Sequence, residues 1–244
     1  MSRDAVMEEL TPWKLDNGEP LTLATGFYNP YWLLNEVSNG DDKKWFRGNF
    51  TLNVKPMKGL NVRLRASADT WNKRGWKFDN YYTLWDRDGQ YETFREESTN
   101  YHYEAVASYN YRWKEVSLNA HLGASLQNNS GRYMRSTVDQ LAEPDVKALS
   151  NNAPILKGFE LYNGKEKQSV FGLLSLGYKG MFIDATFRND WTSSLPKGNN
   201  SYIYPSVSAS AVLTEIIPSI ANKTLTFVKL RGSYAQVGND TSFD

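Results

Sequence analysis

The chain has 244 residues, with 28 Lys or Arg and 27 Asp or Glu, which gives a net charge of +1. This balance offers no one-sign field for holding nucleic acid, and the absence of cysteine excludes a disulfide framework, a thiolate metal site and a cysteine nucleophile. No apolar run approaches the ~18 residues of a membrane-spanning helix, but the strands of a transmembrane barrel need apolar residues only at alternate positions.

Strand patterns dominate the chain. Apolar and polar residues alternate with period two in many segments, most cleanly in "VSLNAHLGASLQ" at 116–127. The one helix candidate, 138–149, is limited to a turn or two by Pro144. Eight strands are predicted, at 45–54, 60–71, 101–111, 116–127, 169–178, 181–191, 204–213 and 227–236.

The connections between the predicted strands alternate in length. Outer-membrane barrels have short periplasmic turns and long extracellular loops, and strands of about ten residues span their ~25 Å apolar band. The sequence therefore predicts an all-β fold, an antiparallel up-and-down transmembrane β-barrel segment of about eight strands that would be an open, curved sheet if alone. The predicted short turns are 55–59, 112–115 and 179–180, and the predicted long loops are 72–100, 132–165 and 192–202.

Each predicted strand has one face for lipid and one for a water-filled lumen. Leu118, Leu122 and Leu126 should face lipid, whereas Asn119 and His121 should face the lumen, because the two kinds of position alternate. Aromatic residues at many strand ends are typical of the girdles at the two membrane interfaces. The polar residues predicted to face the lumen are Arg63, Arg65, His102, Glu104, His121, Asp184 and Arg188.

The aromatic segment 70–94 is a candidate substrate-binding loop. Its rings could stack on sugar faces, or they could pack the loop against its neighbours, and for a loop of this length packing is at least as well supported as stacking. The aromatic residues concerned are Trp71, Trp76, Tyr81, Tyr82 and Trp85.

No catalytic residue, metal site or cofactor is predicted. "DRDG", from Asp86 to Gly89, resembles the start of a calcium loop, but the third acid and the Glu at the twelfth position are missing, and a β-turn explains it as well. The adjacent pair Glu96-Glu97 has no hydrophobic pocket to separate its two pKa values. Asp190 has serines nearby but no neighbouring histidine for a catalytic triad.

Three segments are close to a known family: "NPYWLLNE" at 29–36, "SVFGLLSLGYKGMFIDATFRNDWTSSLPKGNNSYIYPSVSASAVLTE" at 169–215, and "KLRGSYAQVGNDT" at 229–241. They resemble the middle of the barrel in the SusC/RagA family of TonB-linked outer-membrane transporters of Bacteroidota. The resemblance implies a place in the cell outer membrane, in contact with its lipid, and import of glycans or peptides without enzymatic activity. It also implies two protein partners, a SusD-like lipoprotein and TonB.

We expect the chain to depart from the family pattern by lacking a plug domain, a TonB-interacting segment and carboxy-terminal barrel strands. We expect residues 1–44 to be mainly a loop that leads into the barrel, residues 45–244 to be part of the barrel, and the chain to be a fragment. Two other interpretations remain open. One is a soluble carbohydrate-binding β-sandwich that uses the aromatic loop as its platform. The other, more distant, is a β-rich glycoside hydrolase.

Overall fold

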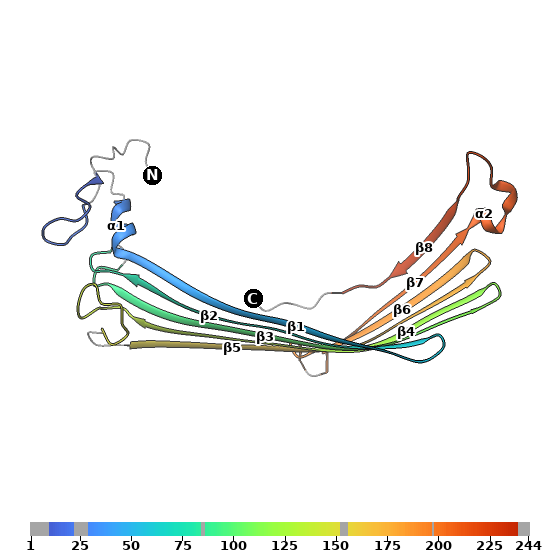
Figure 1. The fold of residues 1–244 in the computed structure, drawn as a ribbon, viewed down its shortest axis with the longest axis horizontal. Helices are drawn as coiled ribbons and strands as arrows, with labels where there is room; N and C mark the ends of the chain where they lie inside the picture. Colours follow the sequence, from blue (N-terminus) through green and yellow to red (C-terminus); the bar gives the residue numbers. More distant parts are fainter. Residues whose placement is uncertain (1–9, 22–28, 84–85, 152–155, 197, 239–244) are drawn as a thin grey trace. The chain divides into compact units, whose positions relative to one another are not determined.

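The computed structural model describes residues 10–21, 29–83, 86–151, 156–196 and 198–238. Its eight strands form one antiparallel sheet in which each strand pairs with its neighbours in the sequence, in the order β1 to β8 (Figure 1). The fold is therefore an up-and-down, open sheet, as the sequence predicts. The strands are β1 (Val37–Met57), β2 (Leu60–Asp79), β3 (Gln90–Trp113), β4 (Val116–Val138), β5 (Leu156–Tyr178), β6 (Met181–Thr192), β7 (Ser201–Val212) and β8 (Lys229–Ala235).

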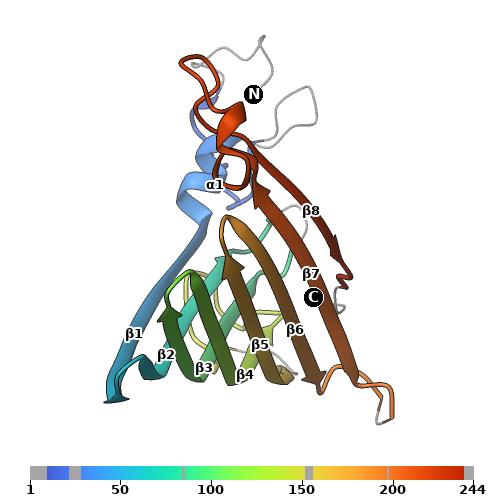
Figure 2. The ribbon, with the colours of Figure 1, turned by 90° about the vertical axis from the view of Figure 1, so that its right-hand side faces the viewer.

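The chain divides into two compact units, and strands β1 to β5 contribute residues to both. Unit 1 comprises 1–45, 70–98 and 131–163, and unit 2 comprises 46–69, 99–130 and 164–244. Strands β6, β7 and β8 belong wholly to unit 2, where they lie side by side (Figure 2).

The alternation of short and long connections is confirmed, with one exception. Two residues separate β1 from β2, β3 from β4, and β5 from β6, whereas the connections that follow β2, β4 and β6 are longer. In the β5–β6 turn, Lys179 has φ 45° and Gly180 has φ 79°. Positive φ at both central positions defines the type I′ turn that matches the twist of a hairpin. The exception is the β7–β8 connection, which contains α2 (Leu213–Ile216) and the 3-10 helix η2 (Pro218–Ile220).

Strands β1 to β5 are much longer than the sequence predicts. They have 20 to 24 residues each, and strand structure occupies much of 72–100 and 132–165, which were expected to be long loops. That prediction was wrong because segments such as "NKRGWKFD" have no clean apolar alternation. Their strand structure depends on hydrogen bonds to neighbouring strands, which a local pattern does not reveal.

The helices also differ from the prediction. Residues 138–149 contain the end of β4 and turns but no helix, since Pro144 and several turn-forming residues prevent one. A helix that was not predicted, α1 (Pro30–Glu36), lies in 1–44, and β1 already begins at Val37. The Asn29 side chain caps α1 by accepting a hydrogen bond from the backbone N–H of Tyr31 at 3.0 Å. Within the described residues, no helix has both the length and the apolar character needed to cross a membrane.

The packed core lies in unit 1. Phe78, Val138 and Leu141 are buried together there, and partly buried aromatic rings surround them. Unit 2, by contrast, leaves many large apolar side chains exposed, for example Leu122 at 59% and Ile183 at 56%. Soluble monomers rarely expose contiguous apolar patches of more than a few hundred Å², so this face is a candidate contact surface.

Candidate functional site

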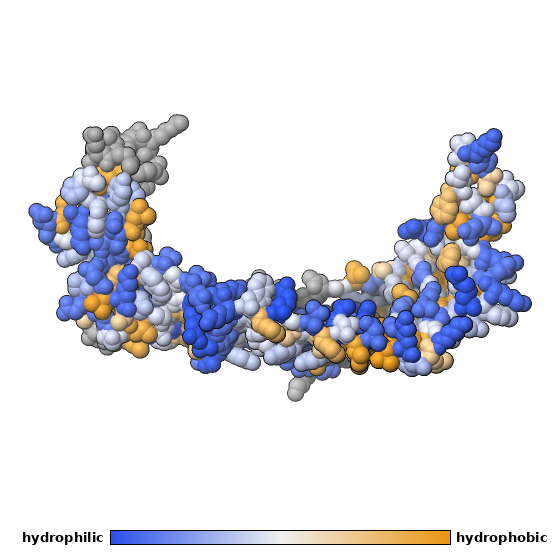
Figure 3. All heavy atoms as spheres, in the orientation of Figure 1, coloured by the Kyte–Doolittle hydropathy of each residue, from blue (hydrophilic) through white to orange (hydrophobic). Residues whose placement is uncertain are grey.

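The two faces of the sheet in unit 2 differ in chemistry. The register between β6 and β7 places Ile183 opposite Ala209 and Phe187 opposite Pro205, whereas Asp184 lies opposite Ser208 on the other face. The same alternation continues into β5, where Ser175 lies opposite Asp184. In Figure 3, apolar residues gather along the lower border of the right-hand part of the molecule. We call the two sides of unit 2 the apolar face and the polar face.

Cross-strand ion pairs lie on the polar face, and one of them joins two of the predicted lumen residues. Arg63 Nη2 lies 3.5 Å from Glu104 Oε1, which joins β2 to β3. Arg47 Nη2 lies 2.5 Å from Asp69 Oδ2, which joins β1 to β2. These pairs are partly exposed, and such pairs contribute little to stability, so their main effect is to set charge positions along the face.

The two histidines lie on neighbouring strands of the polar face. His121 Nδ1 is 2.8 Å from the hydroxyl of Ser108, and the backbone carbonyl of His102 accepts a hydrogen bond from Ser67 at 3.4 Å. Arg65 lies on the same strand as Arg63, two positions further along, and its side chain is exposed. Among the described residues, no group of three His, Asp or Glu side chains is placed to hold a metal ion.

A compact charge cluster surrounds Asp190 near the end of β6. Its carboxylate is buried and accepts hydrogen bonds from Lys167 Nζ at 2.9 Å and from Arg188 Nε at 2.7 Å. Arg188 also donates to the hydroxyl of Ser169 at 2.9 Å. The two cations compensate the charge of the buried Asp190 carboxylate, so that this carboxylate stays ionised although it is partly desolvated. Arg188 was among the predicted lumen residues, but its ion pair with Asp190, and the pairing of Asp190 with Lys167, were not predicted.

An aromatic ring also lies on the polar face, where the alternation did not predict one. The guanidinium carbon of Arg188 is 5.6 Å from the centroid of the Phe171 ring, a cation–π distance. The ring packs over Gly123, where a Cβ atom would come within 2.5 Å of it. Glycine is therefore required at this position of β4 so that Phe171 and Arg188 can pack on the polar face.

The candidate substrate-binding aromatics do not form one platform among the described residues of unit 1. Trp76 and Tyr81 pack against the Phe78 core, and the hydroxyl of Tyr81 donates to the backbone carbonyl of Leu141. Trp71 is half-buried in β2 with Lys43 Nζ 4.0 Å from its ring centroid, and Tyr82 lies beside Tyr81 with its ring centroid 6.3 Å away. Trp85 lies outside the described residues.

Two asparagines that the sequence analysis missed organise the loops of unit 1. The side chain of Asn80 donates to Glu36 of α1 and to Asp145, and it accepts from the backbone N–H of Asp145 at 3.2 Å. The side chain of Asn151 makes four hydrogen bonds to the backbone between 142 and 146. Turn-rich surroundings were the only sequence signal for either residue, because their partners lie far along the chain or on irregular backbone.

The acidic turn at Asp86 has altered titration. Burial, together with the nearby carboxylates of Asp139, Asp79 and Asp88, raises the pKa of the Asp86 carboxyl to about 6, against the opposing effect of Lys157. The turn is held by hydrogen bonds from the backbone N–H groups of Asp86 and Gly89 to Thr83 and Asp86, respectively. This geometry agrees with the β-turn interpretation of "DRDG".

No protein-family model and no curated protein matches the chain. Its fold matches solved structures of the RagAB peptide transporter, with a TM-score of 0.78 and 19% identity over 86% of this chain and 24% of that chain. The RagAB peptide importer in its "closed-closed" state matches with a TM-score of 0.80 and 20% identity, over 92% of this chain and 26% of that chain. The RagAB peptide importer in its "open-open" state matches with a TM-score of 0.78 and 19% identity, over 90% of this chain and 26% of that chain.

The chain has the fold of a section of these transporter chains. It spans about a quarter of the length of the solved chains that it matches. At these identities the likeness is one of fold, and the residues on the two faces must be argued from their own chemistry.

Proposed function

We propose that the chain is part of the wall of a TonB-dependent, SusC-like importer in the cell outer membrane. The observation that carries this proposal is the exposed apolar face of unit 2, which lies on a sheet whose other face is charged and hydrogen-bonded. Soluble monomers rarely expose an apolar patch of more than a few hundred Å². In a barrel wall, lipid covers this face and water fills the lumen on the other side.

In this proposal the polar face lines the passage for substrate. The lumen-facing residues are those predicted from the sequence, Arg63, Arg65, His102, Glu104, His121, Asp184 and Arg188, together with Lys167 and Asp190. The face carries both charge signs at close spacing. A surface of this kind can exchange hydrogen bonds with the backbone and side chains of a peptide, or with the hydroxyls of a glycan.

Peptides are the substrate class to test first, because the structures of similar fold are described as peptide transporters. Glycans are the second class. The proposal also includes a SusD-like lipoprotein and TonB as partners of the complete importer. It assigns no catalytic role to any residue of the chain. The rival interpretation, a carbohydrate-binding β-sandwich, requires two packed sheets, whereas the eight strands form a single sheet.

Cysteine labelling can test which face meets lipid, because the chain has no cysteine of its own. Asn119→Cys and Leu122→Cys place a thiol on opposite faces of β4, three positions apart. Each variant is expressed from the complete natural gene with any other cysteines replaced, and isolated membranes are treated with a water-soluble maleimide. We expect fast labelling of the Asn119→Cys variant and little labelling of the Leu122→Cys variant, because a thiol in hydrocarbon does not ionise.

Equal labelling of the two variants in intact membranes would contradict the proposal. Dissolving the membranes in denaturant provides the control, since both thiols should then react to completion. Recovery of the protein in the soluble fraction would instead favour the binding-module interpretation. Uptake of labelled peptides and labelled oligosaccharides by cells that express the gene, compared with a deletion strain, would decide between the two substrate classes.

A further inference from the structure

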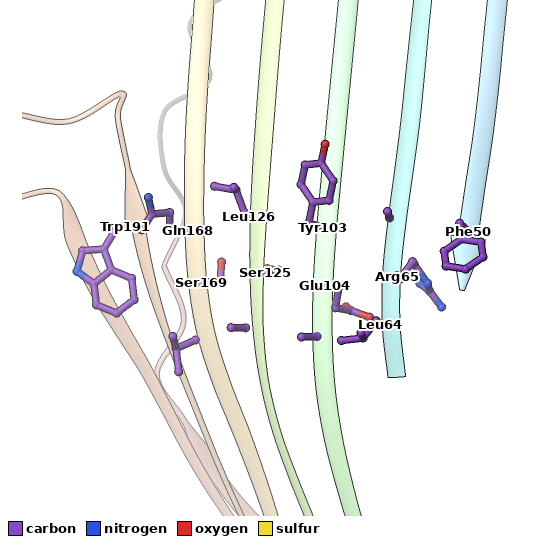
Figure 4. Close-up of a pocket in the computed structure, with 14 residues that line it drawn as sticks. Phe50, Leu64, Arg65, Tyr103, Glu104, Ser125, Leu126, Gln168, Ser169 and Trp191 are labelled. Carbon is purple, nitrogen blue, oxygen red and sulfur yellow. The ribbon is translucent and has the colours of Figure 1, made fainter. Parts of the chain in front are cut away.

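A hollow of about 660 Å³ opens on the apolar face of unit 2. This volume is within the ~300–1,000 Å³ range of ordinary ligand sites. Three alanines, one each from β2, β3 and β4, line the hollow. Larger side chains line it too, among them Phe50, Tyr103 and Trp191 (Figure 4). The alanines are Ala66, Ala105 and Ala124, and the larger apolar side chains are Phe50, Leu64, Tyr103, Leu126, Val170 and Trp191. The lining also includes Arg65, Glu104, Ser125, Gln168 and Ser169, so the hollow is predominantly, not wholly, apolar.

The apolar hollow continues into a second hollow of different chemistry. The second hollow has a volume of about 630 Å³ and shares Gln168, Val170 and Trp191 with the first. It lies where β5 and β6 approach the 193–200 loop. Its other lining residues are Glu166, Thr192, Ser193 and Asn200, so we call it the polar hollow.

The polar hollow is held in place by hydrogen bonds between β5 and the end of β6. The backbone N–H of Glu166 donates to the Ser193 hydroxyl at 2.8 Å, and the backbone N–H of Ser193 donates to the Glu166 carbonyl at 2.9 Å. The Gln168 amide donates to the Glu166 carboxylate at 2.8 Å. The backbone N–H of Thr192 also donates to the carbonyl of Asn200 at 3.0 Å. The polar groups are therefore positioned by the sheet itself.

The charge of the polar hollow limits what it can bind. Its lining offers one carboxylate, two amides and two hydroxyls, and it includes no Lys or Arg. One neighbouring cation, Lys167, is engaged with Asp190. A phosphate or carboxylate head group would be repelled by Glu166 and would find no cation among the residues that line the polar hollow. Sugar hydroxyls, by contrast, could donate to Glu166 and exchange hydrogen bonds with the amides. Trp191, at the junction of the two hollows, presents an indole face of the kind that packs well at a boundary between apolar and polar groups.

We propose that the two hollows together bind a glycolipid, with one alkyl chain in the apolar hollow and an uncharged sugar head group in the polar hollow. This inference rests on the proposed function, because it requires the apolar face to meet lipid. It goes beyond that function, because it assigns to the barrel wall a site for one class of lipid, whereas a barrel wall in general contacts any lipid of the membrane.

Photochemical labelling tests the site. The protein is expressed from its complete natural gene, reconstituted in lipid nanodiscs, and exposed to dodecyl maltoside that carries a diazirine on its alkyl chain. A probe with the same alkyl chain and a phosphate head group is used in parallel, and labelled peptides are mapped by mass spectrometry. We expect the maltoside probe to label 103–105 and 124–126 about fivefold more per residue than 183–187, a preference of ~1 kcal/mol. The phosphate probe should show no such preference.

A matched pair of variants locates the site. Ala105→Phe fills the apolar hollow, whereas Ala185→Phe adds the same ring elsewhere on the apolar face, at an exposed position of β6. The first variant should abolish the enrichment and the second should leave it unchanged. If Ala105→Phe prevents folding, the comparison of the two probes on the unaltered protein still decides the question.

The possible failures are distinguishable. Uniform labelling of the apolar face by both probes would overturn the glycolipid site but would agree with a lipid-facing wall. Equal enrichment by the phosphate probe would overturn the assignment of an uncharged sugar head group. The absence of labelling anywhere on the apolar face would overturn the proposed function itself.

Discussion

Replacement of Leu122 by arginine is the sharpest test of which face of the sheet meets lipid. Leu122 lies six positions after Val116, the first residue of β4, and its side chain is 59% exposed on the apolar face. Six residues at ~3.3 Å each, on a strand tilted by ~40°, correspond to ~15 Å of depth. In an apolar band ~25 Å thick, this depth is close to the middle of the membrane.

The expected cost follows from this depth. An arginine on the lipid face of a barrel destabilises the folded protein by ~2–4 kcal/mol at the midplane and by ~0–1 kcal/mol near the interfaces. Leu122→Arg should therefore lower the free energy of unfolding by ~2–4 kcal/mol. Asn119→Arg is the matched control on the polar face of the same strand, and it should change the free energy of unfolding by less than ~1 kcal/mol because the new charge meets water.

Both variants, made in the complete natural protein, can be compared by urea titration in lipid vesicles, with the slope of each transition checked for constancy. Equal destabilisation by the two variants would refute the assignment of the faces. A larger loss from Asn119→Arg would reverse it. A loss that appears only with Leu122→Arg, and that shrinks in thinner bilayers, would support the estimate of depth.

Three further outcomes are expected. NMR titration should show the Asp86 carboxyl with a pKa of about 6, and a lower pKa in the Asp139→Asn variant. Because the folded loop binds the proton more tightly than the unfolded chain does, the loop's stability should fall as pH rises from about 4 to about 6. An ordinary pKa at Asp86 would contradict this prediction. Gly123→Ala should destabilise unit 2 by ~1–3 kcal/mol, because its Cβ would meet the Phe171 ring. Gly232→Ala on β8 should be nearly neutral in the same denaturant titration, because no described residue beyond its chain neighbours comes within 4 Å of such a Cβ. The 27.9 kDa chain by itself should aggregate in detergent-free buffer, because its edge strands β1 and β8 and its apolar face are open to other chains. A monodisperse monomer in light scattering would count against the proposal.

Much of the candidate site could be predicted from the alternation of apolar and polar residues along single strands. The pairing register around Asp184 and Ile183 separates polar from apolar residues in the manner that the local alternation predicts. The ion pair between Arg63 and Glu104 joins two residues that the alternation had already placed on one face. The cluster around Arg188, by contrast, could not be predicted, because Ser169 reaches Arg188, and Lys167 reaches Asp190, from another strand, and only the register places them there.

The sequence by itself determined the number of strands, their order and the two-faced character of unit 2, because period-two alternation and turn residues act over a few neighbouring positions. Only the tertiary structure decided the features that depend on contacts between distant residues. It extended β2 and β3 through segments without a clean pattern, and it packed Phe171 over Gly123 on the polar face. It also used Asn80 to join residues as far apart as Glu36 and Asp145. Backbone pairing and side-chain packing across the sheet stabilise these features, and the local sequence pattern does not predict such contacts.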